Sequence, residues 1–340
     1  MRASPIKAYA QAGVDVDLGN TLKRGIQSIV RSTHGPEVLG EIGGFGGLFK
    51  ADFNGMKEPV LVASADGVGT KLKVAIAMGR HDTIGQDLVN HCINDIAVIG
   101  ARPLFFLDYI AAGKLEPAVF RQLLSGLARA CKAGRCALIG GETAQMPGMY
   151  REGEYDIAGT IVGVVDRSKM LDGSQVRPGD VLLGLLSEGL HTNGYSLARR
   201  VLFDAMGLKA SCRLPELRLT LGEELLRVHK NYQPALASLG AGTVHAAAHI
   251  TGGGLVDNLP RVLPKDCQAN IRRGSWRVPP IFQIIQRGGA VSPAEMYQVF
   301  NMGIGMVLIV PKKHQAAVVR QTHGRVIGEI VEGAQTVALV

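Results

Sequence analysis

Apolar and polar positions along the chain follow two periods, one typical of strands and one typical of helices. Within residues 84–99, the apolar side chains Ile84, Leu88, Cys92 and Ile96 recur every four positions, and this spacing predicts a helix. A second amphipathic stretch carries Pro117 near its start, as helices often do. Apolar runs of strand length occupy residues 59–65, 104–111, 136–140 and 155–166.

Strand-like and helix-like segments occur again after the polar stretch 166–180. The pattern there predicts a strand at 181–187, helices at 195–206 and 220–239, and a closing strand, helix and strand at 303–310, 312–324 and 325–331. Strands that alternate with helices are typical of a mixed α/β protein. Because the polar stretch separates two such series, we expect two domains, residues 1–166 and 167–340, each with its own core.

Composition narrows the class of protein. Apolar residues make up 46% of the 340 residues, aromatic residues only 5%, and glycine occurs 44 times. No apolar run approaches the length of a membrane span, and residues 1–13 lack the apolar centre of a signal peptide, so we expect a cytoplasmic protein that does not enter a membrane. The five cysteines form no C-x-x-C pair, which favours reduced thiols.

Net charge does not point to nucleic acid. The chain carries a formal charge of +8, but no cluster of basic and aromatic residues marks a nucleic-acid surface. A positive balance is compatible with small phosphorylated substrates.

The loop after the first strand combines an acid, a cation and two glycines. In SADGVGTKL, residues 64–72, Gly67 and Gly69 allow the backbone to turn its N–H groups toward an anion. The spacing matches neither a Walker A loop nor a dinucleotide fingerprint. What remains is Asp66 as an acidic ligand beside Lys71 as a cation for phosphate, and the alternative is a β-turn in which these residues serve only geometry.

The helix over residues 84–99 has one polar face. Asp87, His91 and Asp95 recur at intervals of four, with Asn90 and Asn94 beside them. These short side chains suit a metal or a fixed hydrogen-bond network better than bulk water, although a surface stripe is an equal alternative. Together with Asp66, Asp95 is a candidate ligand for Mg²⁺.

Further glycine-rich segments keep a reactive side chain nearby. Residues 40–49, GEIGGFGGLF, have the composition of a lid over phosphates, and residues 139–150 place Glu142 directly after two glycines. Residues 187–200 nearly match a P-loop but carry Tyr195 in place of the lysine, so only a helix start near Asn193 remains as a phosphate site. His191 lies in this glycine-bordered loop.

Taken together, these segments resemble one enzyme family. DGVGTKL (66–72), CINDIAVIGARPLFFLDY (92–109), GGETAQMPGMY (140–150), LHTNGYSL (190–197) and ITGGGL (250–255) occur in an order and spacing similar to those of the phosphoribosylformylglycinamidine cyclo-ligases. AGVDVDLGN (12–20) and MYQVFNMGIGM (296–306) extend the resemblance over almost the whole chain. Any one segment alone is weak, whereas the set is specific.

The resemblance implies an ATP- and Mg²⁺-dependent enzyme of purine biosynthesis that closes the imidazole ring of formylglycinamidine ribonucleotide. It also implies a two-domain α/β (mixed α+β) fold, in which residues 1–166 bind ATP and pair through their sheets in a homodimer. Residues 167–340 would complete the substrate cleft.

The resemblance further implies roles for single residues. Asp66, Asp95 and Glu142 would lie around the metal, and Lys71 would face the nucleotide phosphates. His191 would accept a proton or orient the intermediate, with Lys71 and Asp95 as further catalytic groups. The expected nucleotide-binding set is Gly43, Gly44, Gly46, Gly47, Asp66, Gly67, Gly69, Thr70, Lys71 and Asn193.

Two positions depart from the family pattern, and two other kinds of protein remain alternatives. Gln145 stands where the family commonly has glutamate, so we assign it no acid or metal role. Val228 stands where the family usually has proline, which leaves the substrate contacts of His229 and Tyr232 in the same segment open. A related ATP-dependent enzyme, such as thiamine monophosphate kinase or selenophosphate synthetase, is disfavoured by the LHTNGYSL and MPGMY segments and by the absence of cysteine beside the first glycine loop. A nucleotide-binding regulatory protein would bind ATP without turnover.

Overall fold

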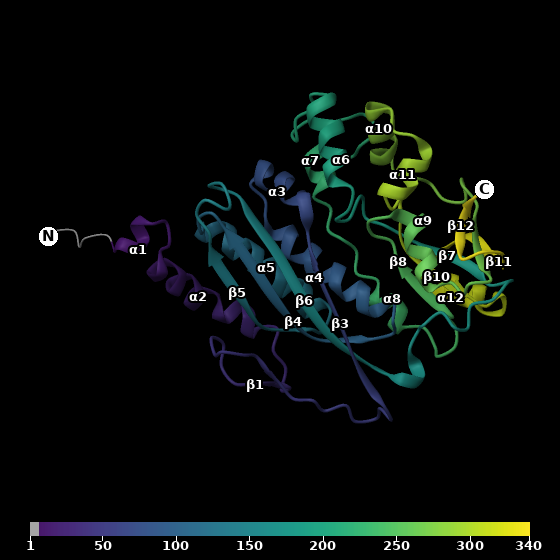
Figure 1. Ribbon diagram of the computed structural model, residues 1–340, viewed down its shortest axis with the longest axis horizontal. Helices are drawn as coiled ribbons and strands as arrows, with labels where there is room; N and C mark the ends of the chain where they lie inside the picture. Colours follow the sequence, from purple (N-terminus) through teal and green to yellow (C-terminus); the bar gives the residue numbers. More distant parts are fainter. Residues whose placement is uncertain (1–6) are drawn as a thin grey trace.

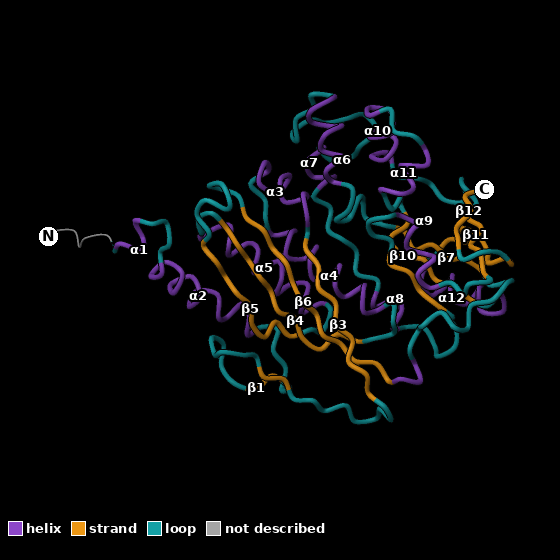
Figure 2. Tube along the Cα trace, viewed as in Figure 1, coloured by secondary structure: helices purple, strands orange, loops and turns teal. Residues whose placement is uncertain are grey.

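The computed structural model describes residues 7–340. Residues 1–6, part of the segment 1–13 that was examined above for a signal peptide, lie outside the described part. Two β-sheets organise the chain, one from each half (Figure 1). The segment 167–180 connects the last strand of the first sheet to the first strand of the second. Figure 2 shows the two groups of strands side by side, with helices and loops above and between them.

The N-terminal sheet has four strands in the order β3-β6-β4-β5, antiparallel except for the pair β4 and β5. Helices α4 and α5 pack on one face and on each other, and Gly85 and Gly126 mark the point of closest approach, where a Cβ atom would meet the partner helix's backbone. The bounds are β3 Pro59–Gly67, α3 Leu72–Met78, α4 Asp82–Ala97, β4 Arg102–Ala112, α5 Pro117–Ala133, β5 Ala137–Gln145 and β6 Tyr155–Asp166.

The other face of this sheet is exposed along β3, whereas at β4 Phe49 packs on Phe105 with ring centroids 5.3 Å apart. Along β3 the side chains alternate between exposed and half-buried, and Leu61 on this face is 61% exposed. Tyr109 of β4 is 39% exposed. An apolar sheet face with this exposure is unusual in a monomer. Before the sheet come α1 Ala8–Gln11, α2 Val16–Arg31 and the short hairpin β1 Val38–Leu39 with β2 Leu48–Phe49.

The C-terminal sheet has six strands in the order β12-β9-β11-β7-β10-β8. Strand β10, which lies between β7 and the edge strand β8, is buried at every position, which explains the continuous apolar run in the sequence. The strands are β7 Val181–Leu186, β8 Ala246–His249, β9 Cys267–Ile271, β10 Ile304–Val310, β11 Arg325–Glu332 and β12 Thr336–Leu339. The helices are α6 Tyr195–Arg199, α7 Leu221–Leu225, α8 Gln233–Ala237, α9 Gly254–Asn258, α10 Pro280–Gly289, α11 Pro293–Val299 and α12 Gln315–Thr322.

Most elements predicted from the pattern are confirmed, and one is wrong. The expected helix at 220–239 is two short helices, α7 and α8, separated by a non-helical stretch. Within that stretch, the backbone of residues 229–232 bonds to side chains of α4 instead of to its own neighbours. The helix predicted at 195–206 is present, with a π-helical turn at Arg200–Ala205 after α6.

No helix within residues 7–340 has both the length and the apolar character needed to cross a bilayer.

Candidate functional site

The polar face of α4 lies against the C-terminal domain, where it holds an extended segment. Asp87 accepts a hydrogen bond from the backbone N–H of His229 (2.7 Å), and Asn90 donates to the carbonyl of the same residue (2.7 Å). One turn further on, Asn94 donates to the carbonyl of Lys230 and accepts from the N–H of Tyr232, both at 2.8 Å. The expected hydrogen-bond network is therefore real, and its partner is the backbone of the other domain.

Lys71 belongs to this junction between the domains. Its side chain is fully buried, and its ammonium donates to the carbonyls of His191 (3.1 Å) and Arg227 (2.7 Å) and pairs with Asp87 (2.8 Å). Burial lowers the pKa of Lys71 and raises the pKa of Asp87 to about 6, and the attraction between the two groups opposes both shifts. With these partners, Lys71 is not free to face a nucleotide phosphate as the sequence led us to expect.

A chain of hydrogen bonds connects Asp66 to Asp95 through three imidazoles and one hydroxyl. His91 Nε2 lies 2.8 Å from Asp66, and its Nδ1 lies 2.9 Å from Thr192 Oγ1. The hydroxyl lies 3.3 Å from His229 Nδ1. His229 Nε2 lies 2.9 Å from His249 Nε2, and His249 Nδ1 lies 2.8 Å from Asp95 Oδ1. We call this set, Asp66, His91, Thr192, His229, His249 and Asp95, the relay.

Five simultaneous hydrogen bonds require the relay to hold one more proton than its neutral side chains supply. The five contacts each need one proton, whereas three neutral imidazoles and one hydroxyl supply only four, since both end carboxylates only accept. One imidazole is therefore an imidazolium. Burial opposes charge on His91, but its hydrogen bond to Asp66 and the negative charges of Asp95 and Asp66 raise its pKa overall. Burial lowers the pKa of His229 and of His249.

Because the pKa of His91 alone among the three imidazoles is raised, we assign the surplus proton to His91, and the direction of every bond then follows. His91 donates to Asp66 and to Thr192, and Thr192 donates to His229 Nδ1. The inner members are buried, while the side chains of Asp66 and Asp95 are 41% and 25% exposed. Only the two carboxylate ends can exchange a proton with a bound molecule.

His191 lies beside the relay without joining it. Its ring stacks on His229 with centroids 4.0 Å apart, and burial lowers its pKa well below the ordinary value, so it is neutral. The N–H of Glu188 donates to His191 Nε2 (3.1 Å), so the ring proton must lie on Nδ1, which has no hydrogen-bond partner among the described residues. This tautomer is a donor, which favours an orienting role over that of a general base.

A glycine in strand β10 makes room for this arrangement. A Cβ atom at Gly305 of β10 would collide with the hydroxyl of Tyr232 and with the ring of His191. The Tyr232 hydroxyl donates to the carbonyl of Leu186 (2.9 Å), so the strand, the loop of His191 and the segment held by α4 meet at this point.

The glycine-rich segment expected to cover phosphates lies away from the relay. Residues 43–47 line a cavity of about 700 Å³ at the β5 edge of the N-terminal sheet, together with Asp108 and Glu142. Because β3 and β5 are the opposite edges of that sheet, Glu142 is not brought to Asp66 or Asp95 within one chain. Of the three expected metal ligands, Asp66 and Asp95 therefore lie at one site, whereas Glu142 lies apart from them.

Asp108 gives this second cavity a measurable pH dependence. Burial raises the pKa of its carboxyl to about 7, and no cation pairs with it among residues 7–340. The folded state then binds more protons than the unfolded state between about pH 4 and pH 7, so the free energy of unfolding falls as pH rises through that range.

We expect Asp108→Asn to remove this slope and to raise the free energy of unfolding at pH 8 by about 1–3 kcal/mol, because asparagine stays neutral. Urea unfolding at pH 5, 6, 7 and 8 measures the effect. Asp156→Asn, on an exposed position of β6, is the control. An Asp108→Asn variant whose stability changes with pH as the parent's does would contradict the assignment.

The remaining expected residues lie near the relay. Asp66 Oδ1 accepts the N–H of Gly67 (2.7 Å), and the hydroxyl of Thr70 lies 3.0 Å from that of Ser196 in α6. Gly69 has a φ of +66°, a conformation that glycine adopts without strain. Asn193 is half-buried next to Thr192. The structure brings Asp66, Asp95, His191 and Asn193 to one junction.

Three functional candidates were missed in the sequence, Thr192, His249 and Asp108, whereas His229 was named there only as a substrate contact left open by Val228. His249 follows three alanines in a fully buried strand, and Asp108 interrupts an apolar strand, so each was visible as a polar residue in an apolar run. Thr192 and His229 lie outside regular strands and helices, and their pattern gives no such signal.

Comparison with known proteins identifies the family. Residues 53–165 match the family described as AIR synthase related protein, N-terminal domain, and residues 177–340 match its C-terminal domain. The phosphoribosylformylglycinamidine cyclo-ligase of Syntrophotalea carbinolica is 51% identical over 342 residues, which cover 98% of each chain. That of Geobacter metallireducens is 50% identical over 341 residues, again 98% of each chain. The chain belongs to the phosphoribosylformylglycinamidine cyclo-ligase family.

Solved structures show how this cyclo-ligase family member relates to other enzymes. Thiamine-monophosphate kinase from Stenotrophomonas maltophilia is 19% identical with a TM-score of 0.64, covering 92% of this chain and 95% of that one. Hydrogenase maturation protein HypE in complex with ATP is 17% identical with a TM-score of 0.67, covering 93% and 90%. These likenesses show a shared fold, whereas the identity of about half the residues is with cyclo-ligases.

Proposed function

We propose that the chain catalyses the ATP-dependent closure of formylglycinamidine ribonucleotide to aminoimidazole ribonucleotide, with release of ADP and phosphate. The observation that carries this function is the identity of 51% with a cyclo-ligase over 98% of both chains. The kinase and HypE alternatives rest on 19% and 17% identity and share only the fold.

The reaction needs a leaving group, a close approach and a place for a proton. An amide oxygen leaves poorly until ATP phosphorylates it, and the substrate's own nitrogen then attacks the activated carbon as phosphate departs. Holding the substrate folded makes this attack intramolecular. The nitrogen loses one proton, which a carboxylate end of the relay, Asp66 or Asp95, is placed to receive. His191 is buried and supports the reaction indirectly, through its ring stacked on His229 of the relay.

Lys71 acts in this proposal as a positioning residue. Its ammonium fixes the carbonyl of His191, whose φ of +62° lies in the left-handed region that non-glycine residues rarely adopt. By also holding Arg227 and Asp87, it locks the loop of His191 and the segment leading to His229 onto the N-terminal domain.

The residues present fit Mg²⁺ in part. Mg²⁺ prefers carboxylate oxygens, and those of Asp66 and Asp95 lie 2.8 and 3.8 Å from the same nitrogen of His91 while remaining partly exposed. These two residues would hold the ion, which would neutralise phosphate charge during phosphoryl transfer. Ligand atoms of His91, Asp95 and His249 also lie within 4.8 Å of one another, but His249 is hydrogen-bonded to Asp95, and His91 to Asp66 and Thr192.

We expect Asp66→Asn to raise the Mg²⁺ concentration at half-maximal turnover by about tenfold, because one negative charge near the ion is lost. ADP formation across a Mg²⁺ titration measures this, and the Mg²⁺ dependence of thermal stability with a non-hydrolysable ATP analogue provides a readout independent of catalysis. Asp204→Asn, exposed in the C-terminal domain, is the control. An unchanged Mg²⁺ midpoint in both assays would remove Asp66 from the metal site.

We further propose a cytosolic homodimer that pairs through the exposed face of the N-terminal sheet. The exposed apolar side chains of Leu61 and Tyr109 support this face as the interface. The division into residues 1–166 and 167–340 follows the separate sheets of the two halves. In such an assembly the lid residues 43–47 and Glu142 can serve ATP near the junction of the subunits.

Leu61→Asp should convert the dimer to monomers, since a charge on each copy would be buried against the other. Sedimentation velocity at micromolar concentration measures the change. Leu219→Asp, 39% exposed in the C-terminal half, should leave the mass unchanged. A Leu61→Asp protein that still sediments as a dimer would place the interface elsewhere.

The function itself is tested by incubating the protein with MgATP, with and without formylglycinamidine ribonucleotide. Equal amounts of ADP and aminoimidazole product that depend on the substrate support the proposal. ATP binding without either product would favour a regulatory protein of the same fold.

A further inference from the structure

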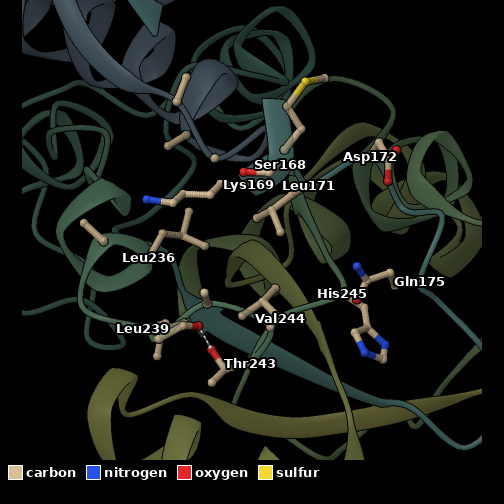
Figure 3. A pocket seen from close by; sticks show the side chains of 18 of the residues that line it. Ser168, Lys169, Leu171, Asp172, Gln175, Leu236, Leu239, Thr243, Val244 and His245 are labelled. Carbon is tan, nitrogen blue, oxygen red and sulfur yellow. Dashed lines mark hydrogen bonds between the residues drawn. The ribbon is translucent and has the colours of Figure 1, made fainter. Parts of the chain in front are cut away.

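We propose that a cavity between the two domains, at the far end of α4 from Asp87, binds a small sugar phosphate. The cavity has a volume of about 440 Å³, within the range of small-molecule sites. Its walls come from the end of α4, the start of β4, the connection 168–175 and the segment 233–245. In Figure 3, Lys169 and Leu171 of the connection lie across from Leu236, Leu239 and Val244.

Two cations at this cavity make no close side-chain contact among the described residues, although the charge of Lys169 lowers the pKa of Asp166. Arg102 and Lys169 are exposed, and neither makes a hydrogen bond or an ion pair through its side chain within residues 7–340. An adjoining hollow shares Gln175, Gly242 and His245 with the cavity and adds Arg177 and Lys313. The linings of the two hollows therefore include several cationic side chains, and arginine and lysine are the residues that most often bind phosphate.

The acidic groups nearby are already engaged. Asp172 accepts hydrogen bonds from the N–H (2.9 Å) and the hydroxyl (2.6 Å) of Ser174, which lower its pKa. Asp180 lies 2.7 Å from His245 Nδ1 and accepts the N–H of Arg177. Asp172 therefore stays ionised with its oxygens on Ser174, and Asp166 lies close enough to Lys169 for that cation to lower its pKa, so Arg102 is, within residues 7–340, the cation of the lining with no acidic neighbour of this kind.

The rest of the lining favours a sugar over a nucleobase. None of the residues that line the cavity carries a phenyl, phenol or indole ring on which a base would stack. Amide and hydroxyl side chains are present instead, from Ser168, Gln175, Gln233 and Thr243. These groups can bind sugar hydroxyls, while Leu236 and Leu239 cover the apolar face of a ring.

Two walls of the cavity, α4 and the segment 233–245, are close along the chain to residues at the relay. Ala97 of the cavity is two residues from Asp95 on α4, and Gln233 directly follows Tyr232, whose N–H is held by Asn94. A ligand that bridges these walls would alter the contact between α4 and the segment that carries His229. The inference goes beyond the proposed reaction, and its first test does not depend on it.

Calorimetric titration with ribose 5-phosphate tests the site. We expect binding by the parent protein and a loss of affinity of at least about tenfold in Arg102→Ser/Lys169→Ser, because two charge-assisted contacts are removed. Arg121→Ser/Lys132→Ser on α5 has the same change of charge away from the cavity and should bind as the parent does.

Other results would overturn the proposal. Undetectable binding at about 10 mM, or equal binding by the Arg102→Ser/Lys169→Ser protein, would exclude this cavity as the site. Inorganic phosphate binding as tightly as ribose 5-phosphate would exclude sugar recognition, and a preference for AMP would contradict the argument from the lining. If the reaction is established, ribose 5-phosphate should change the substrate KM about fivefold or more in the parent protein but not in the variant; an unchanged KM would contradict the coupling.

Discussion

Lys71→Met should lower the free energy of unfolding by about 3–5 kcal/mol, because the carboxylate of Asp87 would stay buried without its cation. The carbonyls of His191 and Arg227 would also lose their shared donor. Urea unfolding at neutral pH measures the loss. The expected size is a large fraction of the stability of a typical domain, so part of the protein should be unfolded at 37 °C.

A second substitution separates charge from packing. Replacing both members of the pair, in Lys71→Met/Asp87→Leu, should recover much of the lost stability, since no unpaired charge remains buried. Lys73→Met, two residues away and paired with Glu154 at the surface, should cost less than about 1 kcal/mol. A stable Lys71→Met protein with a selective loss of ATP affinity would instead return Lys71 to the role that the sequence suggested.

Thr192→Val should lower turnover by about a hundredfold while leaving the KM for ATP unchanged. Valine has the shape of threonine without the hydroxyl, so the relay is cut between His91 and His229. Three contacts then remain for three neutral imidazoles, and the surplus proton is no longer needed. The imidazolium of His91 should titrate at a lower pH than in the parent protein.

Nitrogen-15 spectra of the histidine rings, recorded across a pH titration, measure this proton directly. Thr192→Ser keeps the hydroxyl and should retain both the spectrum and most of the turnover. If Thr192→Val loses turnover without any change in the His91 titration, the threonine serves packing alone and the relay has no part in proton transfer.

The sequence predicted the residues of the site better than their contacts. The polar face of α4 was visible because Asp87, His91 and Asp95 interrupt an apolar period at intervals of four. Whether such a face meets a metal, water or another domain depends on long-range packing, which periodicity does not encode. The extended segment 229–232 is stabilised by α4, more than 130 residues earlier.

The expectation that Lys71 faces a nucleotide phosphate met a related physical limit. A lysine beside glycines and an aspartate has the composition of a phosphate site, and nothing local reveals that Asp87 will lie 2.8 Å away in a fully buried pair. Glu142 shows the same limit, since strand order, rather than distance along the chain, places it at the edge of the sheet opposite Asp66.

The most direct test of the central claim follows one oxygen atom. Formylglycinamidine ribonucleotide labelled with oxygen-18 in its amide carbonyl is converted with unlabelled MgATP, and the inorganic phosphate is examined by mass spectrometry. Phosphorylation of the amide oxygen followed by amine attack predicts one labelled oxygen in each phosphate formed, in step with the imidazole product. Label that appears in water, with unlabelled phosphate, would contradict this mechanism.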